Sequence, residues 1–221
     1  MIHPHTELRH ISDEMGRGVF ATRTIPRGTI TWTLCGFDRA FSPAEVAAMP
    51  PAYQEIIAEY GYIEAGGSFI LCWDHARCHN HACNPTSHAI GNDVEIAVRD
   101  ILPGELLSCE YGVLNLTADL ACRCGAPDCR RVIRGDDALR YGHKWDARVR
   151  EALPSAARVP QPLWPFVKNQ EAVTAVLNGR AEITGHDTYY RPDAAPSLPA
   201  VQASGRTRLW GLPAPSQAGT P

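Results

Sequence analysis

Three cysteines lie within eight residues near the middle of the chain, and this cluster constrains the fold more than any other feature. Cys122, Cys124 and Cys129 follow the pattern C-x-C-x4-C, with Gly125 and Pro127 between them to bend the chain. Three closely spaced thiolates can occupy three corners of a tetrahedral zinc site. Because a structural zinc normally has four protein ligands, the pattern predicts that a cysteine or histidine from elsewhere completes it.

The chain contains 221 residues and eight cysteines, which could also be read as four disulfides. Its N-terminus has neither a basic start nor an apolar stretch, so we expect no signal peptide and an intracellular protein with reduced thiols. A net charge of -3 argues against a general nucleic-acid binder. No apolar run approaches the roughly 20 residues of a membrane span. We therefore expect one structural zinc ion, and we expect the protein to bind neither membranes nor nucleic acids.

Residues 72–85 form a second segment rich in histidine and cysteine. The segment can supply the fourth zinc ligand, or it can hold a metal ion independently. Its spacing matches no common zinc pattern, which favours the interpretation that a single residue completes the downstream cluster. The independent site predicts more than one zinc ion per chain, whereas completion of the cluster predicts one.

Short strands separated by turns are predicted for the first half of the chain. Residues 29–34 alternate polar and apolar side chains with the period of a half-buried strand. Further strands are expected at residues 19–24 and 94–99. Proline and glycine predict sharp reversals after these two strands, at residues 25–28 and 101–105.

Helices are predicted between the strands and beyond the cysteine cluster. Ser42 and Glu45 form a capping-box pattern with Pro43 at the first helical position, which predicts a helical insert over about residues 42–61. Beyond the cysteine cluster we expect two helices and then a disordered proline-rich tail, at residues 137–153, 165–177 and 191–221.

Four segments together resemble a SET-domain protein lysine methyltransferase with a post-SET zinc motif. In chain order they are G-R-G-V-F-A at residues 16–21, N-H-A-C-N-P at residues 80–85, G-E-L-L-S-C-E-Y-G at residues 104–112, and the C-x-C-x4-C cluster. Each segment is unspecific alone, but their order and spacing agree with this family. The resemblance extends over about residues 7–135.

The resemblance implies a mainly β, β-clip fold of small curved sheets with a helical insert, a pseudoknot and a C-terminal helical extension. In the pseudoknot, the C-terminal segment threads under a loop. The implied divisions are a SET domain, a post-SET zinc motif, a helical extension and the proline-rich tail, at residues 1–118, 119–135, 136–190 and 191–221.

The resemblance also implies S-adenosylmethionine in one pocket and a target lysine of a protein or peptide substrate in a channel that opens on the opposite face. The implied cofactor-binding residues are Gly16, Arg17, Gly18, Asn80 and His81. The implied zinc ligands are Cys83, Cys122, Cys124 and Cys129. Tyr111 would lie at the methyl-transfer channel, and residues 130–133 would close over the cofactor. Candidate channel aromatics are Tyr62, Phe69 and Trp73.

Three residues depart from the family pattern. Thr86 stands where asparagine is usual, Glu110 where aspartate is usual, and Cys78 where an aromatic residue is usual. These departures keep a second interpretation open, in which the chain is a catalytically inactive, zinc-stabilised module that binds a peptide or protein. Cofactor affinity and dependence on Tyr111 distinguish the two interpretations.

Overall fold

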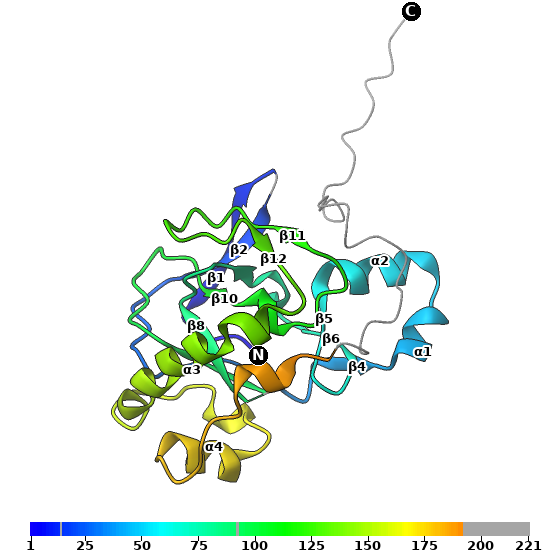
Figure 1. Cartoon of the computed structure of the whole chain (residues 1–221). Coiled ribbons are helices and arrows are strands. Elements are labelled where there is room, and N and C mark those ends of the chain that lie inside the picture. The colour runs from blue at the N-terminus through cyan, green and yellow to red at the C-terminus, as the bar shows by residue number, and fades with distance from the viewer. Residues whose placement is uncertain (14, 92, 192–221) are drawn as a thin grey trace, which may run out of the picture.

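The computed structural model describes residues 1–13, 15–91 and 93–191. The disordered tail expected from residue 191 onward lies outside these residues, apart from Arg191. The strands form small sheets of two or three strands each, and helices occupy an insert and the C-terminal part (Figure 1). The mainly β architecture with a helical insert and a helical C-terminal part is therefore confirmed. Within the described residues, no helix has the length and apolar character needed to cross a membrane.

A three-stranded antiparallel sheet lies at the centre, with strands in the order β3–β9–β8. These strands span Ile30–Thr33, Val94–Ala97 and Ser87–Gly91. The predicted strand at residues 29–34 is confirmed, but it is fully buried rather than half-buried. A bulge between Ile30 and Trp32 directs these two side chains into different core clusters. The hydroxyls of Thr31 and Thr33 donate to backbone carbonyls of residues 95 and 93, which allows them to be buried.

Three two-stranded sheets surround this centre. Antiparallel pairs form between β1 and β2 and between β11 and β12, and a parallel pair forms between β7 and β10. Their bounds are Thr6–Ser12, Gly16–Ala21, Leu120–Ala121, Val132–Ile133, Asn80–His81 and Ser108–Cys109. The parallel pair is short, yet it places the motif segment at residues 80–85 beside the one at residues 104–112. Threading of the chain into a pseudoknot stays a prediction.

The helical insert contains α1 and α2 and packs on a further antiparallel sheet, in the order β4–β6–β5. The elements span Pro43–Ala47, Pro51–Tyr60, Arg39–Phe41, Phe69–Leu71 and Gly61–Ile63. The predicted capping box is present, because Ser42 Oγ accepts from the Glu45 N–H and the Glu45 carboxylate accepts from the Ser42 N–H. Val46, Ile57 and Phe69 form the core between the helices and the sheet.

The C-terminal part consists of α3 (Asp137–Ala156), α4 (Gln170–Leu177) and the 3-10 turns η3 (Trp164–Phe166) and η4 (His186–Tyr189). The helix expected at residues 165–177 begins later, because Asn169 caps α4 by accepting from the Ala172 N–H. In Figure 1, α3 and α4 lie on the opposite side of the small sheets from α1 and α2.

Two tight turns, after the predicted strands 19–24 and 94–99, lie side by side. Gly28 and Gly104 adopt φ values of 88° and 83°, a region that favours glycine. Ile25 and Ile101 pair across the two turns through backbone hydrogen bonds of 2.9 Å in both directions. The strands themselves end earlier than predicted, at Ala21 and Ala97.

Candidate active site and metal centre

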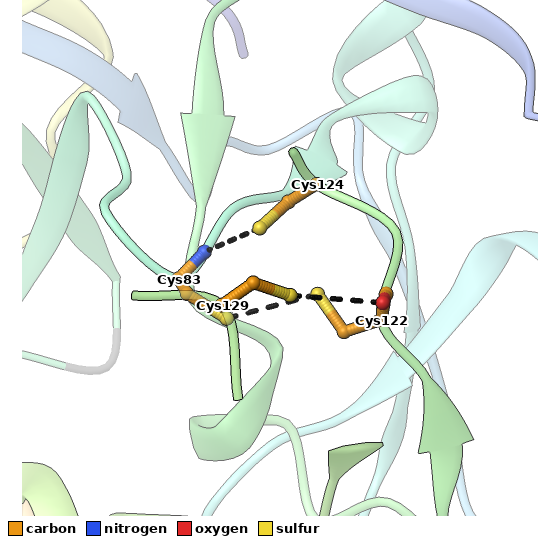
Figure 2. A group of neighbouring side chains, drawn as sticks. All are labelled: Cys83, Cys122, Cys124 and Cys129. Carbon is orange, nitrogen blue, oxygen red and sulfur yellow. Dashed lines mark hydrogen bonds between the residues drawn. The ribbon is translucent and has the colours of Figure 1, made fainter. Parts of the chain in front are cut away.

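Four cysteine side chains converge where the loop between β11 and β12 meets the end of β7. The ligand atoms of Cys83, Cys122, Cys124 and Cys129 all lie within 4.8 Å of one another (Figure 2). The sulfurs of Cys83 and Cys122 are 3.7 Å apart. Tetrahedral zinc–thiolate bonds of about 2.3 Å space sulfur atoms about 3.8 Å apart, so this donor set fits one zinc ion. All eight cysteines are free, which excludes the reading as four disulfides.

Backbone N–H groups surround these sulfurs and favour their ionised form. The N–H groups of Arg130 and Arg131 donate to Cys83 Sγ and Cys129 Sγ at 3.3 and 3.4 Å. Burial raises the pKa of the Cys124 thiol, but hydrogen bonds from the N–H groups of Cys83 and Ala126 outweigh it and lower the pKa to about 7. Burial raises the pKa values of Cys83 and Cys122, so Cys124 is the thiol whose surroundings most favour the thiolate that binds metal.

The glycine-flanked loop that opens β2 contacts the strand that carries Asn80. The Asn80 side chain donates from Nδ2 to the carbonyl oxygen of Arg17 at 2.9 Å. A Cβ atom added to Gly18 would lie 3.0 Å from Asn80 Nδ2 and 2.7 Å from Leu106 Cδ1, so a larger residue would require these side chains to shift. Gly16 has a φ of 70°, which also favours glycine. The structure therefore brings together Gly16, Arg17, Gly18 and Asn80.

His81 connects Asn80 to Tyr111 and to the cysteine cluster. Its Nδ1 accepts from the Tyr111 N–H at 3.2 Å, and its Nε2 lies 3.4 Å from Cys83 Sγ. Burial and, to a smaller extent, the charge of Arg130 lower the pKa of His81 to about 3, so the ring is neutral at pH 7. Since Nδ1 accepts, Nε2 carries the ring proton and donates to the sulfur.

The Tyr111 hydroxyl donates to the carbonyl oxygen of His79 at 2.7 Å. Tyr111 lies two residues after the end of β10, and His79 directly precedes β7, so the parallel pairing of these strands positions both groups. Burial raises the pKa of Tyr111 above its ordinary value, which keeps the hydroxyl protonated at neutral pH. The group can therefore hold a ligand by hydrogen bonding but cannot act as a base.

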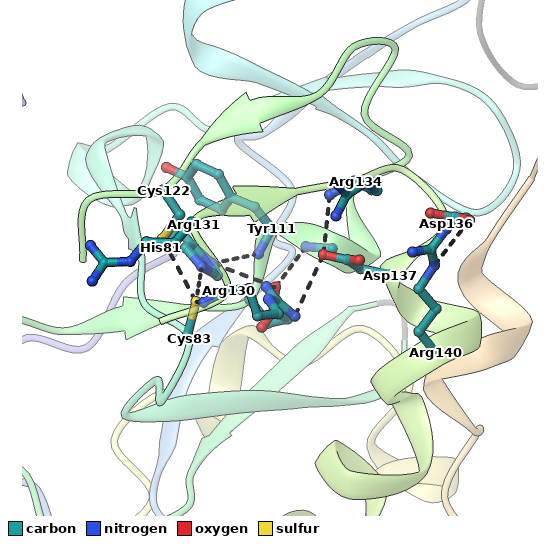
Figure 3. Close-up of polar contacts among 12 residues, drawn as sticks. His81, Cys83, Tyr111, Cys122, Arg130, Arg131, Arg134, Asp136, Asp137 and Arg140 are labelled. Atoms are coloured by element: carbon teal, nitrogen blue, oxygen red, sulfur yellow. Dashed lines mark hydrogen bonds and ion pairs between the residues drawn. The ribbon is translucent and has the colours of Figure 1, made fainter. Parts of the chain in front are cut away.

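Glu110 belongs to a buried ion-pair network that the sequence does not reveal. Figure 3 shows Arg130 and Asp137 of this network. The guanidinium of Arg130 lies 2.6 Å from Glu110 Oε1 and 3.6 Å from Asp137 Oδ2. It also lies over the rings of Tyr141 and Trp145, 5.0 and 5.5 Å from their centroids. Burial raises the pKa of Glu110 to about 7, although Arg130 opposes the shift. In the sequence, the only indication of this network was the Glu110 carboxylate next to Tyr111. A carboxylate needs a cation beside it if it is buried.

The other departures from the family pattern have structural partners. Thr86 is buried, and its hydroxyl accepts from the Ser108 N–H at 2.9 Å, which ties β10 to the segment before β8. Cys78 is half-buried against the core cluster that contains Trp32. Among the candidate channel aromatics, Phe69 is a core residue of the helical insert, whereas Trp73 is 49% exposed.

Comparison with known proteins finds a similarity to one family over the first half of the chain. Residues 16–112 match the family model of the SET domain. Among solved structures, the methyltransferase domain of human Histone-lysine N-methyltransferase SETMAR matches with a TM-score of 0.43 and 20% sequence identity. That match covers 61% of this chain and 58% of the other, so the chain spans less than two thirds of the solved domain. Curated protein sequences yield no match. The glycine loop, β7 and Tyr111 all fall inside residues 16–112, the part of the chain that matches the SET-domain family model.

Proposed function

We propose that this protein transfers a methyl group from S-adenosylmethionine to the side-chain amine of a lysine in a protein substrate. The observation that carries the proposal is the SET-domain match over residues 16–112. It includes three segments distant in sequence that lie together in the structure: the glycine loop of β2, the strand Asn80–His81, and Tyr111. The implied partner is a protein or peptide that presents a lysine.

The cofactor pocket is proposed at the glycine loop and the neighbouring strand, with Gly16, Arg17, Gly18, Asn80 and His81 as its residues. Support comes from the close backbone approach at Gly18 and from the hydrogen bond that joins Asn80 to Arg17. When bound, S-adenosylmethionine supplies an electrophilic methyl group on a positively charged sulfur. The protein's task is then to align the amine with this methyl group, since correct orientation contributes a large part of catalysis in such displacements.

Tyr111 is proposed to position the amine of the substrate. Its hydroxyl proton is donated to the His79 carbonyl, so the lone pairs of its oxygen stay available to accept from an amine N–H or a polarised C–H. Free lysine has a pKa of about 10.4, so the attacking amine must first lose a proton. Buried surroundings such as those of Tyr111 favour the neutral amine.

The four-cysteine cluster is proposed to hold one structural zinc ion as a post-SET motif. Cys83 lies two residues after His81, and the other three ligands come from the loop between β11 and β12. A zinc ion there would join this loop to the strand of the cofactor pocket. Its role would be to assemble one wall of the site and not to take part in the chemistry.

Calorimetric titration of zinc-loaded protein with S-adenosylmethionine, followed by methylation of a lysine-peptide library, tests the proposal. We expect one-to-one cofactor binding. Tyr111→Phe should bind the cofactor with unchanged affinity but transfer methyl groups about 100-fold more slowly, as expected when one positioning hydrogen bond is lost. Tyr189→Phe is the matched control, because Tyr189 is a buried tyrosine that lies outside the SET match.

Two results would contradict the proposal. A folded, zinc-loaded protein that fails to bind the cofactor would favour the alternative of an inactive peptide-binding module. Equal methylation rates in Tyr111→Phe and the wild type would remove Tyr111 from the positioning role, even if the cofactor binds.

A further inference from the structure

A second group of metal-ligand side chains lies outside the four-cysteine cluster. It consists of His79, Glu95 and Cys109, whose ligand atoms all lie within 4.8 Å of one another. The three residues come from the segment before β7, from β9 and from β10. His79 and Cys109 are buried, and the Glu95 side chain is only 16% exposed. The histidine-rich segment 72–85 thus contributes a single residue to this group.

The His79 ring has no hydrogen bond to any residue that the structure describes. Its Nδ1 lies 3.7 Å from Glu95 Oε2, which is too long for a hydrogen bond, and its Nε2 is buried without a partner. Buried polar groups normally have partners, so this imidazole requires an explanation. Two ligands of a tetrahedral zinc ion, bound at about 2.0–2.2 Å, lie about 3.4 Å apart. The His79–Glu95 separation is close to this spacing.

The charges and chemistry of the group also match a divalent ion. Ligation would deprotonate Glu95 and Cys109, and the two negative charges so formed would balance a divalent cation and leave the buried group neutral. The Ser87 hydroxyl donates to Glu95 Oε2 at 3.1 Å, as groups around metal sites often do to a ligating carboxylate. Nitrogen, oxygen and sulfur donors in one site suit zinc better than magnesium or calcium, which prefer oxygen alone.

We propose that His79, Glu95 and Cys109 bind a second divalent metal ion, with zinc as the best chemical match. Three protein ligands leave one coordination position for a water molecule. The site adjoins the proposed methyl-transfer tyrosine, since the His79 carbonyl accepts from the Tyr111 hydroxyl and Cys109 lies two residues before Tyr111. The ion would hold β7, β9 and β10 together behind that tyrosine.

The metal content of the full-length protein tests this proposal, independently of whether it transfers methyl groups. Purified protein is loaded with zinc, desalted and measured by inductively coupled plasma mass spectrometry. We expect two zinc ions per chain in the wild type, and one in His79→Gln, Glu95→Gln and Cys124→Ser. Controls are His88→Gln and Cys35→Ser, which replace a buried histidine and a buried cysteine outside both groups and should keep two ions.

Cobalt titration of the wild type provides a second measurement that does not depend on how the variants fold. The site is supported if the protein binds two successive equivalents of cobalt, each with a thiolate-to-cobalt absorption band. The second band should be weaker than the first, because one ion would have four thiolate ligands and the other only one. A wild type that binds a single equivalent, lost in Cys124→Ser and retained in His79→Gln and Glu95→Gln, would overturn it.

Discussion

Arg131 adopts a φ of 64°, in the left-handed region that non-glycine residues rarely occupy. Arg131 follows Cys129, which belongs to the cysteine cluster, and Arg130, whose guanidinium pairs with Glu110. Its N–H donates to Cys129 Sγ, and its carbonyl accepts from the Cys122 N–H at 2.8 Å. Both hydrogen bonds reach the cysteine cluster, so this backbone conformation is maintained by the cluster and not by the Arg131 side chain.

Replacement of Arg131 by glycine should therefore favour the folded state. Arg131→Gly removes the steric cost of the left-handed conformation, about 1–2 kcal/mol, but adds flexibility to the unfolded chain. We expect its free energy of unfolding to exceed that of Arg131→Ala by about 1 kcal/mol in urea denaturation of zinc-loaded protein. Arg131→Ala is the control because it removes the same side chain and keeps the strain. Equal stability of the two variants would show that the φ angle carries no cost.

The sequence predicts individual site residues unequally well. The spacing of three cysteines and the order of four motifs suffice to place a metal centre beside Tyr111, although occupancy and roles stay predictions. The pairing of Arg130 with Glu110 and Asp137 could not be predicted, because it joins segments whose proximity depends on the fold. The same holds for Glu95, which on β9 reads as an ordinary strand residue until β7 and β10 pack beside it.

At the scale of elements, Arg130 links the loop between β11 and β12 to the segment after β10 and to α3. Its backbone N–H donates to Cys83 Sγ, while its side chain pairs with Glu110, next to Tyr111, and with Asp137, in the first turn of α3. Gly112 allows this convergence, because a Cβ atom there would lie 2.8 Å from the Asp137 Cβ. Displacement of the loop would therefore disturb the Glu110–Tyr111 segment and the helix together.

The variant Cys124→Ser tests whether this link extends to the cofactor pocket. Loss of one thiolate should release the zinc ion from the four-cysteine cluster and free the loop that carries Arg130. We expect the dissociation constant for S-adenosylmethionine, measured by calorimetry, to rise at least about tenfold, which corresponds to 1.4 kcal/mol. Cys35→Ser, at a buried cysteine outside the cluster, should change neither property. Unchanged cofactor affinity in a zinc-depleted Cys124→Ser protein would refute the coupling.

Secondary structure could be predicted from the sequence where neighbouring residues determine it. It was harder to predict where tertiary packing determines it. The capping box at Ser42 and the glycines of the two tight turns specify their elements locally. The burial of all four β3 residues was not predictable, because a bulge places Ile30 in the core shared with the C-terminal helices and Trp32 in the other core cluster. The late start of α4 likewise depends on Val167, which lies in the core instead of continuing a helix.

At the scale of the molecule, the C-terminal helices share one core with the central sheet. The sheet contributes Ile30, Ile90, Val94 and Ile96, and the C-terminal part contributes Val149, Ala152, Leu163, Val167 and Ile183. Gln161 adds polar contacts between the two parts, since it accepts from the Ile30 N–H at 2.8 Å and donates to the Gly28 carbonyl at 2.9 Å. These helices are thus part of the folding unit and not an appendage to it.

A chain that ends at residue 135 should accordingly fail to fold. It would expose the four sheet residues of the shared core, at about 1.5–3 kcal/mol each, a total comparable with the whole stability of a typical domain. We expect such a chain, even with zinc, to show no cooperative thermal transition by near-ultraviolet circular dichroism. A chain that ends at residue 191 keeps every contact described above and should melt like the full-length protein. Cooperative melting of the shorter chain would instead show that the central sheet is stable without α3 and α4, and that the core formed by Trp32 and its neighbours suffices.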